Sequence, residues 1–209
     1  MAETTNTRGI VLYYEPWRDV DRSYVLYTEQ FGKVRAKAMG IRRPKAKQAG
    51  VLEPFAEVEL YLIASRYQYK IGGAVVQQRF PAISQELARY NAALYCVEVF
   101  HRLTKEAVPD TALYLLLYST LTWLDHAPYS RLVVLSFVVK LVQQLGYDLL
   151  HTVKRPEDIK VLRWLASAPY QEVQKLRLDA TTWQALYQGV HLWLYEYLGD
   201  DVQSEQFLV

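Results

Sequence analysis

The chain has 209 residues, enough for one large or two small domains, and 51% of them are hydrophobic, which excludes a generally disordered protein. The net charge of +2 conceals an asymmetry, since residues 1–80 contain 13 Lys and Arg against 8 Asp and Glu, whereas residues 81–209 contain 11 against 14. A function that depends on positive charge is therefore expected in the N-terminal part.

Cysteine usage and apolar runs indicate the expected environment. Cys96 is the only cysteine, so the sequence offers neither an intrachain disulfide nor a cysteine-based zinc cluster, and we expect no metal or cofactor. Residues 1–9 lack the apolar run of a signal peptide, and the aliphatic runs at 113–117 and 132–139 are too short to span a bilayer. We expect a cytoplasmic protein that does not act at a membrane.

Residues 7–79 show the two-residue period of β-strands. A β-branched and aromatic run, Ile10–Tyr14, is expected to end at Glu15–Trp17, before a polar loop at 18–21. Residues 24–28 turn through 30–32 into the next strand, which predicts a hairpin, and further strands are expected at 55–64 and 67–71. The core-facing residues of the 55–64 strand are expected to be Val58, Leu60, Leu62 and Ala64. Five strands in about seventy residues predict a small barrel of the oligonucleotide-binding (OB) type.

The stretch 33–47 contains seven basic residues and no acidic residue. Its first part alternates strictly, so that Val34, Ala36 and Ala38 are expected to face the core and the intervening basic residues the opposite side. Gly40 then ends the strand, and Pro44 keeps the basic loop extended. A lysine-rich strand can simply be a solvated sheet edge, but the missing counter-charges favour binding of nucleic-acid phosphates. The candidate contacts are Lys33, Arg35, Lys37, Arg42, Arg43, Lys45 and Lys47.

Aromatic residues are frequent in the same region. Most aromatic side chains in strands are core or cross-strand partners, but single-stranded bases are also bound by stacking on exposed rings. Trp17, which stands beside Arg18 in an expected loop, is the best single candidate for such stacking.

From Pro81 onward the period becomes that of α-helices. Ser84 is expected to cap a first helix, a second begins at Pro109-Asp110, a third ends at Gly146, a short one begins at Pro156, and the last is capped by Asp179. The fold class is therefore α+β, with a five-stranded OB-fold barrel in residues 1–80 and an all-helical domain in residues 81–209.

The sequence contains no pattern that indicates an enzyme. The four histidines lie in four different expected segments, without the spacing of a metal site, and no phosphate-binding glycine loop or nucleophile elbow is present. Cys96 lies on an apolar helical stripe and is interpreted as a core residue. We expect a protein that is not an enzyme.

The N-terminal third resembles the RecO family, the bacterial recombination mediators. That family shows, in this order, a "GIVL" strand, an acidic turn, a "T-E-x-x-G-K" hairpin, an "A-K-G-x-R-R-P-K" arm and an "L-x-P-F" strand entry. The matching residues are Gly9–Leu12, Asp19–Asp21, Thr28-Glu29 with Gly32-Lys33, Lys37 with Gly40 and Arg42–Lys45, and Leu52 with Pro54-Phe55. The helical half matches more loosely, at 95–104 and 145–147.

The resemblance implies an OB-fold barrel and a helical domain that bind single- and double-stranded DNA and anneal complementary strands. It also implies partners, namely RecR and the acidic C-terminal tail of single-strand binding protein, so that RecA can load. By position, Lys37, Arg42, Arg43 and Lys45 would contact DNA, and Arg131 would contact the acidic tail. Many members of the family carry four zinc-binding cysteines after the 145–147 element, and this sequence has none there.

Two other functions remain compatible with these residues. One is a protein-interaction scaffold, in which the aromatic helical domain binds partners and the barrel only supports it. The other is an OB-fold RNA-binding protein, because a cationic surface binds the phosphates of either nucleic acid and only contacts to the 2′-hydroxyl separate RNA from DNA.

Overall fold

A computed structural model describes residues 4–43, 46, 50–65 and 68–208. The chain forms two compact units. The first contains the strands and residues 104–121, and the second contains residues 82–103 together with the chain from Thr122 onward.

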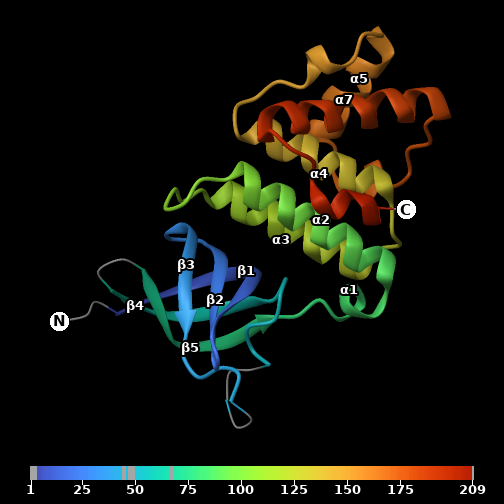
Figure 1. Cartoon of the computed structure of the whole chain (residues 1–209). Coiled ribbons are helices and arrows are strands. Elements are labelled where there is room, and N and C mark those ends of the chain that lie inside the picture. Colours follow the sequence, from blue (N-terminus) through green and yellow to red (C-terminus); the bar gives the residue numbers. More distant parts are fainter. Residues whose placement is uncertain (1–3, 44–45, 47–49, 66–67, 209) are drawn as a thin grey trace. The chain divides into compact units, whose positions relative to one another are not determined.

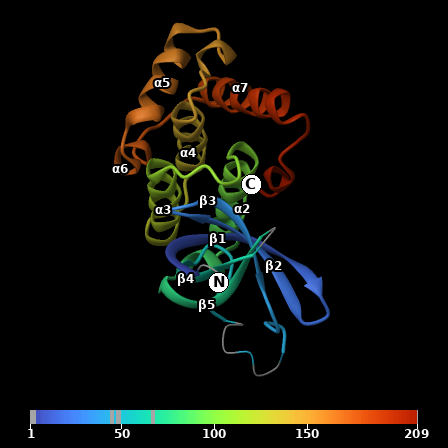
Figure 2. The ribbon, with the colours of Figure 1, turned by 90° about the vertical axis from the view of Figure 1, so that its left-hand side faces the viewer.

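Five strands close into a barrel in the first unit (Figure 1). They are β1 (Thr4–Arg18), β2 (Asp21–Thr28), β3 (Gly32–Ala38), β4 (Glu57–Ala64) and β5 (Tyr69–Gln78). Their order around the barrel is β1-β2-β3-β5-β4, with only the β3–β5 pair parallel, and Figure 2 shows the strands curving around one another. The closed five-stranded barrel and the helices after it confirm the predicted α+β class and OB-type architecture.

The barrel core comes from the faces that the alternation predicted. Val34, Ala36 and Ala38 of β3 are buried among the core residues, as expected. The β4 residues Val58, Leu60 and Leu62 are also in this core, whereas Ala64 at the end of β4 is exposed, contrary to expectation. The β2–β3 hairpin is confirmed, with Thr28 paired to Gly32 at its turn.

Strand β1 is longer than predicted. Residues 4–10 pair with β4, and the strand then continues past Pro16 to Arg18 while it pairs with β2. A proline ends a strand only where both of its edges must hydrogen-bond. Beyond Ile10 the pairing with β4 has ended, so Pro16 lies on a strand with one paired edge, and the expected end at Glu15–Trp17 is wrong.

The remaining elements are helical (Figure 1). They are α1 (Pro81–Gln85), α2 (Leu87–Leu103), α3 (Thr111–His126), α4 (Arg131–Gln144), η1 (Leu150–Thr152), α5 (Pro156–Ser167), α6 (Tyr170–Val173), α7 (Ala180–Leu198) and η2 (Gln203–Phe207). Within the described ranges, no helix combines the length and the apolar character needed to cross a membrane.

Four of the five predicted helix ends are right and one is wrong. Helix α3 begins directly after Pro109-Asp110, and α5 begins at Pro156, as expected. Asp179 caps α7 by accepting a hydrogen bond from the Thr182 backbone at 2.9 Å, and Gly146 follows α4 with a φ of 86°. Ser84 is not a cap, because it lies inside α1. The first turn of α1 instead donates two backbone N–H groups, of Ala82 and Ile83, to Asp125.

Candidate nucleic-acid interface

The first basic residue of β3 is not displayed at the surface. Lys33 is only 5% exposed, and its ammonium donates to the backbone carbonyl of Thr104. Residues 104–107 run beside the strand, since Lys33 bridges to Glu106 and its carbonyl accepts from Ala107 at 3.0 Å. Burial lowers the pKa of Lys33. The expected exposure of Lys33 is therefore wrong, because a segment far along the chain covers it.

The second basic residue, Arg35, is paired with a carboxylate. Its Nε donates to Glu106 at 3.0 Å, and its side chain also reaches the hydroxyl of Tyr13 at 3.5 Å. The hydrogen bond that Arg35 donates to Glu106 raises the pKa of Arg35. The expectation that no counter-charge reaches the strand is wrong at this position. Both side chains are about half exposed, however, and an exposed pair of this kind is weak enough for a phosphate to replace the carboxylate.

The third basic residue, Lys37, lies over an indole ring. Its ammonium is 3.2 Å from the centroid of Trp17, which is 47% exposed at the end of β1 and not in a loop as expected. A cation held against an exposed ring combines a phosphate contact with a stacking surface.

Two further cations lie beside Lys37 that the sequence had not singled out as contacts. Lys70 of β5 is its partner in the parallel register, and both Lys70 and Arg18 contribute to a lowered pKa of Lys37, after desolvation as the main cause. The sequence signal for either residue is weak, because each is an isolated basic residue outside the basic stretch.

Arg42 and Arg43 follow β3 on an ordered turn. The backbone N–H of Gly40 donates to Asp21 at 2.7 Å, and that of Arg42 donates to the Val20 carbonyl at 3.0 Å, which fixes this turn beside the β1–β2 connection. Both arginine side chains are exposed, and neither forms an ion pair with a carboxylate among the described residues. Lys45 and Lys47, the other two candidates of the arm, lie outside the described residues.

These residues form one surface, which we call the cationic patch. Arg43 and Arg18 line a common hollow together with Met39 and the carboxylates Asp19 and Asp21. Arg18 and Lys70 are the cationic neighbours of Lys37, and Asp21 is its acidic neighbour. The patch consists of Arg18, Lys37, Arg43 and Lys70 around Trp17. It offers several positive charges and one exposed ring, an arrangement that binds a sugar-phosphate chain without reading base edges.

Arg131 lies at a different site, in the second unit. It is the first residue of α4 and lines a pocket of about 180 Å³ whose floor is apolar, with Val134, Val138 and Val190. Burial raises the pKa of Tyr129 at the same rim, and the nearby Arg131 partly offsets this effect. Arg131 is exposed and has no ion pair within the part of the chain that the structure describes. The pocket can accept an apolar side chain of a peptide, with a carboxylate of the same peptide on the guanidinium of Arg131.

The described residues contain no group of three or more His, Cys, Asp or Glu side chains that could hold a metal ion. Cys96 is fully buried, and burial raises the pKa of its thiol. It lies in the core of the helical unit, as the sequence predicted.

The fold and the patch define a class of protein, a small OB-type barrel with a cationic surface that is joined to a helical unit. A family model described as "Recombination protein O N terminal" matches residues 1–75, and one described as "Recombination protein O C terminal" matches residues 84–152. The chain therefore belongs to the RecO family.

Curated relatives agree with this assignment. The chain is 35% identical over 123 residues to the DNA repair protein RecO of Geobacter metallireducens, covering 59% of this chain and 50% of the relative. It is 31% identical over 139 residues to that of Myxococcus xanthus (66% and 57%), and 33% over 141 residues to that of Geobacter sulfurreducens (68% and 58%). The chain thus spans about half the length of the curated relatives it matches.

Proposed function

We propose that this protein is a recombination mediator without enzymatic activity, acting in DNA repair on the cytoplasmic nucleoid. In this role it binds single- and double-stranded DNA, anneals complementary strands and, with RecR, helps RecA to load onto strands coated by single-strand binding protein. Membership of the RecO family supports the proposal, as do relatives named DNA repair protein RecO. The observation that carries it is the cationic patch together with the adjoining exposed Arg42, since neither Arg42 nor Arg43 forms an ion pair with a carboxylate among the described residues.

The mechanism follows from what the patch can and cannot contact. Lysine and arginine side chains neutralise phosphates of any sequence, and a strand held by its backbone keeps its bases free to pair. Two complementary strands bound in this way no longer repel each other, so annealing needs no covalent step. Trp17 adds stacking, which is also indifferent to sequence.

The domains divide the work in this proposal. Residues 1–80 hold the nucleic acid, and residues 81–209 hold protein partners. The pocket beside Arg131 is proposed to receive the acidic tail of single-strand binding protein, with its terminal phenylalanine on the apolar floor and a carboxylate on the guanidinium. Docking on the tail would bring the barrel to coated DNA.

A charge-reversal experiment tests the DNA site. The double variant Arg42→Glu/Arg43→Glu is expected to lower affinity for unrelated single strands by a similar factor, roughly 10-fold or more at moderate salt, and to reduce the slope of log affinity against log salt. Fluorescence anisotropy with labelled oligonucleotides at several salt concentrations measures both quantities.

The matched control is Lys160→Glu/Arg163→Glu, which makes the same charge change at two exposed positions of α5. An equal loss in the control would show that only overall charge matters. A loss confined to one DNA sequence, or a preference for RNA over the matched DNA strand, would contradict the proposed contact with DNA backbones.

A further inference from the structure

The segment that follows α7 is an acidic strap that folds back onto the helical unit. We define the strap as residues 199–208. It contains the carboxylates Asp200, Asp201 and Glu205, followed by Phe207 and Leu208. Within it only Val202 and Ser204 are buried, so the strap lies largely on the surface.

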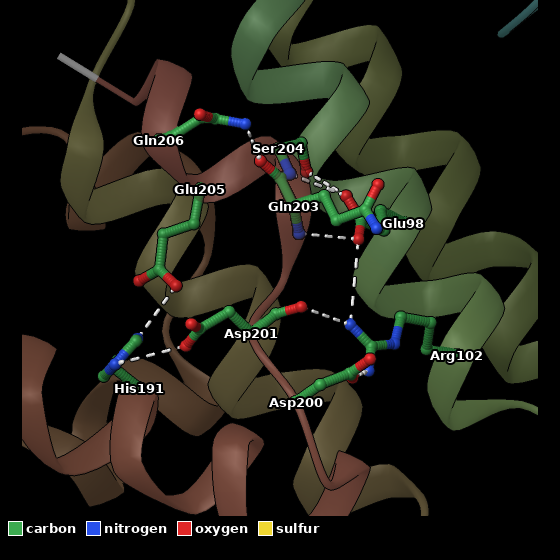
Figure 3. Close-up of polar contacts among 9 residues, drawn as sticks. All are labelled: Glu98, Arg102, His191, Asp200, Asp201, Gln203, Ser204, Glu205 and Gln206. Carbon is green, nitrogen blue, oxygen red and sulfur yellow. Dashed lines mark hydrogen bonds and ion pairs between the residues drawn. The ribbon is translucent and has the colours of Figure 1, made fainter.

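The strap is held by one carboxylate of α2. Glu98 accepts the backbone N–H of Gln203 at 2.9 Å and that of Ser204 at 2.8 Å, and it also accepts the Ser204 hydroxyl (Figure 3). These are the first N–H groups of η2, which its own turn leaves unpaired. Glu98 therefore acts as a cap supplied from another helix, and it holds the strap together with Asn91 of α2, whose side-chain amide donates to the Phe207 carbonyl at 3.0 Å.

The strap's own carboxylates contact the side chains of Arg102 and His191, and Arg102 also forms an ion pair with Glu98 at 3.8 Å. Arg102 pairs with Asp200 and also donates to the Asp201 carbonyl at 2.7 Å. His191 lies 2.8 Å from Glu205 and 4.0 Å from Asp201, so both acidic side chains face one imidazole (Figure 3).

The strap also forms one side of the pocket that contains Arg131. Glu205 and Leu208 line this pocket together with His191. The hydroxyl of Tyr187, another lining residue, donates to Glu205 at 2.6 Å. An incoming acidic peptide would thus meet both a resident carboxylate and a guanidinium without a described ion pair in this pocket.

The strap and the partner proposed for this pocket share their chemistry, because each has acidic residues followed by a phenylalanine. We propose that the strap is an internal competitor, which in the free protein engages the side chains of Arg102 and His191 and must yield when an acidic peptide docks. This inference rests on the proposed function, since it concerns regulation of the same pocket. A tethered segment competes at a high effective concentration and therefore weakens the binding of every acidic peptide.

The anchors of the strap suit a displaceable element. The side chains of Asp200 and Asp201 are each 71% exposed, and exposed ion pairs contribute little to stability, whereas the Glu205 side chain is only 11% exposed and is the firmest of the three. A surface segment with few buried side chains opens locally at a much smaller free-energy cost than global unfolding. Displacement of the strap would free the His191 ring, which lines the pocket, for an incoming carboxylate, whereas Arg102 would keep its ion pair with Glu98.

The test uses a labelled synthetic peptide with several aspartates and a C-terminal phenylalanine, titrated into the full chain. In the variant Asp200→Asn/Asp201→Asn/Glu205→Gln the strap keeps its contacts to Glu98 but loses its charges. We expect this variant to bind the peptide roughly 3- to 10-fold more tightly than the unchanged chain. The variant Glu157→Gln/Glu172→Gln/Glu196→Gln, which removes three exposed carboxylates outside the strap, is expected to change affinity by less than about 2-fold.

Hydrogen exchange gives a second measurement. If the strap were only structural, peptide binding would not change amide exchange within it. Peptide binding to the unchanged chain is expected to speed amide exchange at Gln203 and Ser204, because displacement breaks their bonds to Glu98. Slower exchange at these amides would overturn the proposal, since the strap would then be part of the bound site. If the charge-neutral variant fails to fold in a thermal melt, Glu98→Gln loosens the strap from the other side and is expected to tighten peptide binding in the same direction.

The outcomes separate this inference from the proposed function. Binding that Arg131→Glu abolishes, but that neutralising the strap leaves unchanged or weaker, overturns the internal competitor and retains the docking site. Tight binding only after the strap is neutralised supports both. Absence of peptide binding in every variant removes the docking site and the competitor together.

Discussion

At the scale of single residues, the environment of each basic side chain decides whether its charge is available. Three basic residues alternate along β3, and the structure gives them three different environments. Lys33 is buried against a backbone carbonyl, Arg35 is paired with Glu106, and Lys37 lies on Trp17. Only the last two can contact a phosphate without unfolding the strand's surroundings, so the contribution of β3 to DNA binding is smaller than its composition suggests.

Glu106 is expected to act as a built-in competitor of DNA at Arg35. Glu106→Gln removes the negative charge but keeps a hydrogen-bonding side chain, so affinity for single-stranded DNA should rise about 2- to 5-fold and the salt slope should steepen by roughly one phosphate contact. Anisotropy titrations at several salt concentrations measure both. Glu59→Gln, which removes the same charge from β4, is the control. An equal gain in both variants, or none in either, would show that Arg35 does not contact DNA.

At the scale of elements, the β2–β3 hairpin depends on a glycine and on a segment from beyond α2. Gly32 has a φ of 63°, and a Cβ added there would lie 2.2 Å from the Val108 carbonyl oxygen. Glycine is therefore required at this position for two reasons, the left-handed backbone of the turn and the close approach of residues 104–110. The same segment is tied to β2, where the Tyr27 hydroxyl donates to the Asp110 carbonyl at 3.4 Å.

Gly32→Ala is expected to destabilise the protein by about 2–4 kcal/mol, since backbone strain and a clash with backbone atoms add together. Gly146→Ala separates the two causes. Its φ of 86° is also positive, but a Cβ there meets no atom within 4 Å, so it should cost only about 1 kcal/mol. Urea unfolding followed by circular dichroism measures the difference. Equal losses of unfolding free energy in the two variants would mean that the segment around Val108 moves away from the added Cβ at no measurable cost.

The raised pKa of Tyr27 predicts that the protein loses stability at high pH. Burial raises the pKa of Tyr27 from 10.0 to about 12. As the pH rises between these values, the unfolded chain loses the phenolic proton first, so this contribution to stability, complete below pH 10, is lost towards pH 12. Urea midpoints on both sides of pH 10 should therefore fall less in Tyr27→Phe than in the unchanged chain. An identical fall in both proteins would contradict the assignment of this pH dependence to Tyr27.

At the scale of the whole molecule, two kinds of contact lie on two separate units. The cationic patch belongs to the barrel unit, and the Arg131 pocket belongs to the helical unit. The proposed mediator role needs both, one to hold the strands and the other to reach DNA that is already coated with protein.

Separate variants should therefore remove separate steps of the reaction. Arg42→Glu/Arg43→Glu should slow annealing of bare and coated strands alike, whereas Arg131→Glu should slow annealing only of strands coated by single-strand binding protein. A strand-annealing assay with and without that protein measures both. If Arg131→Glu slowed annealing of bare strands equally, its pocket would serve DNA and not the acidic tail. If the unchanged chain bound acidic peptides but no DNA at physiological salt, the scaffold function would replace the mediator.

The fold was largely predictable because its signals are local. The alternation of Val34, Ala36 and Ala38 records which side of β3 is buried, and Asp179 and Gly146 mark helix ends through their own backbone chemistry. Ser84 failed as a cap because the group that fills that role, Asp125, comes from 41 residues further along the chain. The predicted strand end near Pro16 was wrong because the length of a strand depends on which of its edges pair with another strand.

The candidate site was predictable only in part. The basic composition of 33–47 is a property of the sequence by itself, as are the presence of five strands within residues 1–80 and the resemblance to the RecO family. The tertiary structure alone decided that Glu106 neutralises Arg35, that Lys37 meets Trp17 and Lys70, and that an acidic strap lines the Arg131 pocket. The reason is physical. The period of a strand shows only whether a side chain faces the core or the surface. The partners of that side chain come from segments far along the chain, and only the closed fold places those segments beside it.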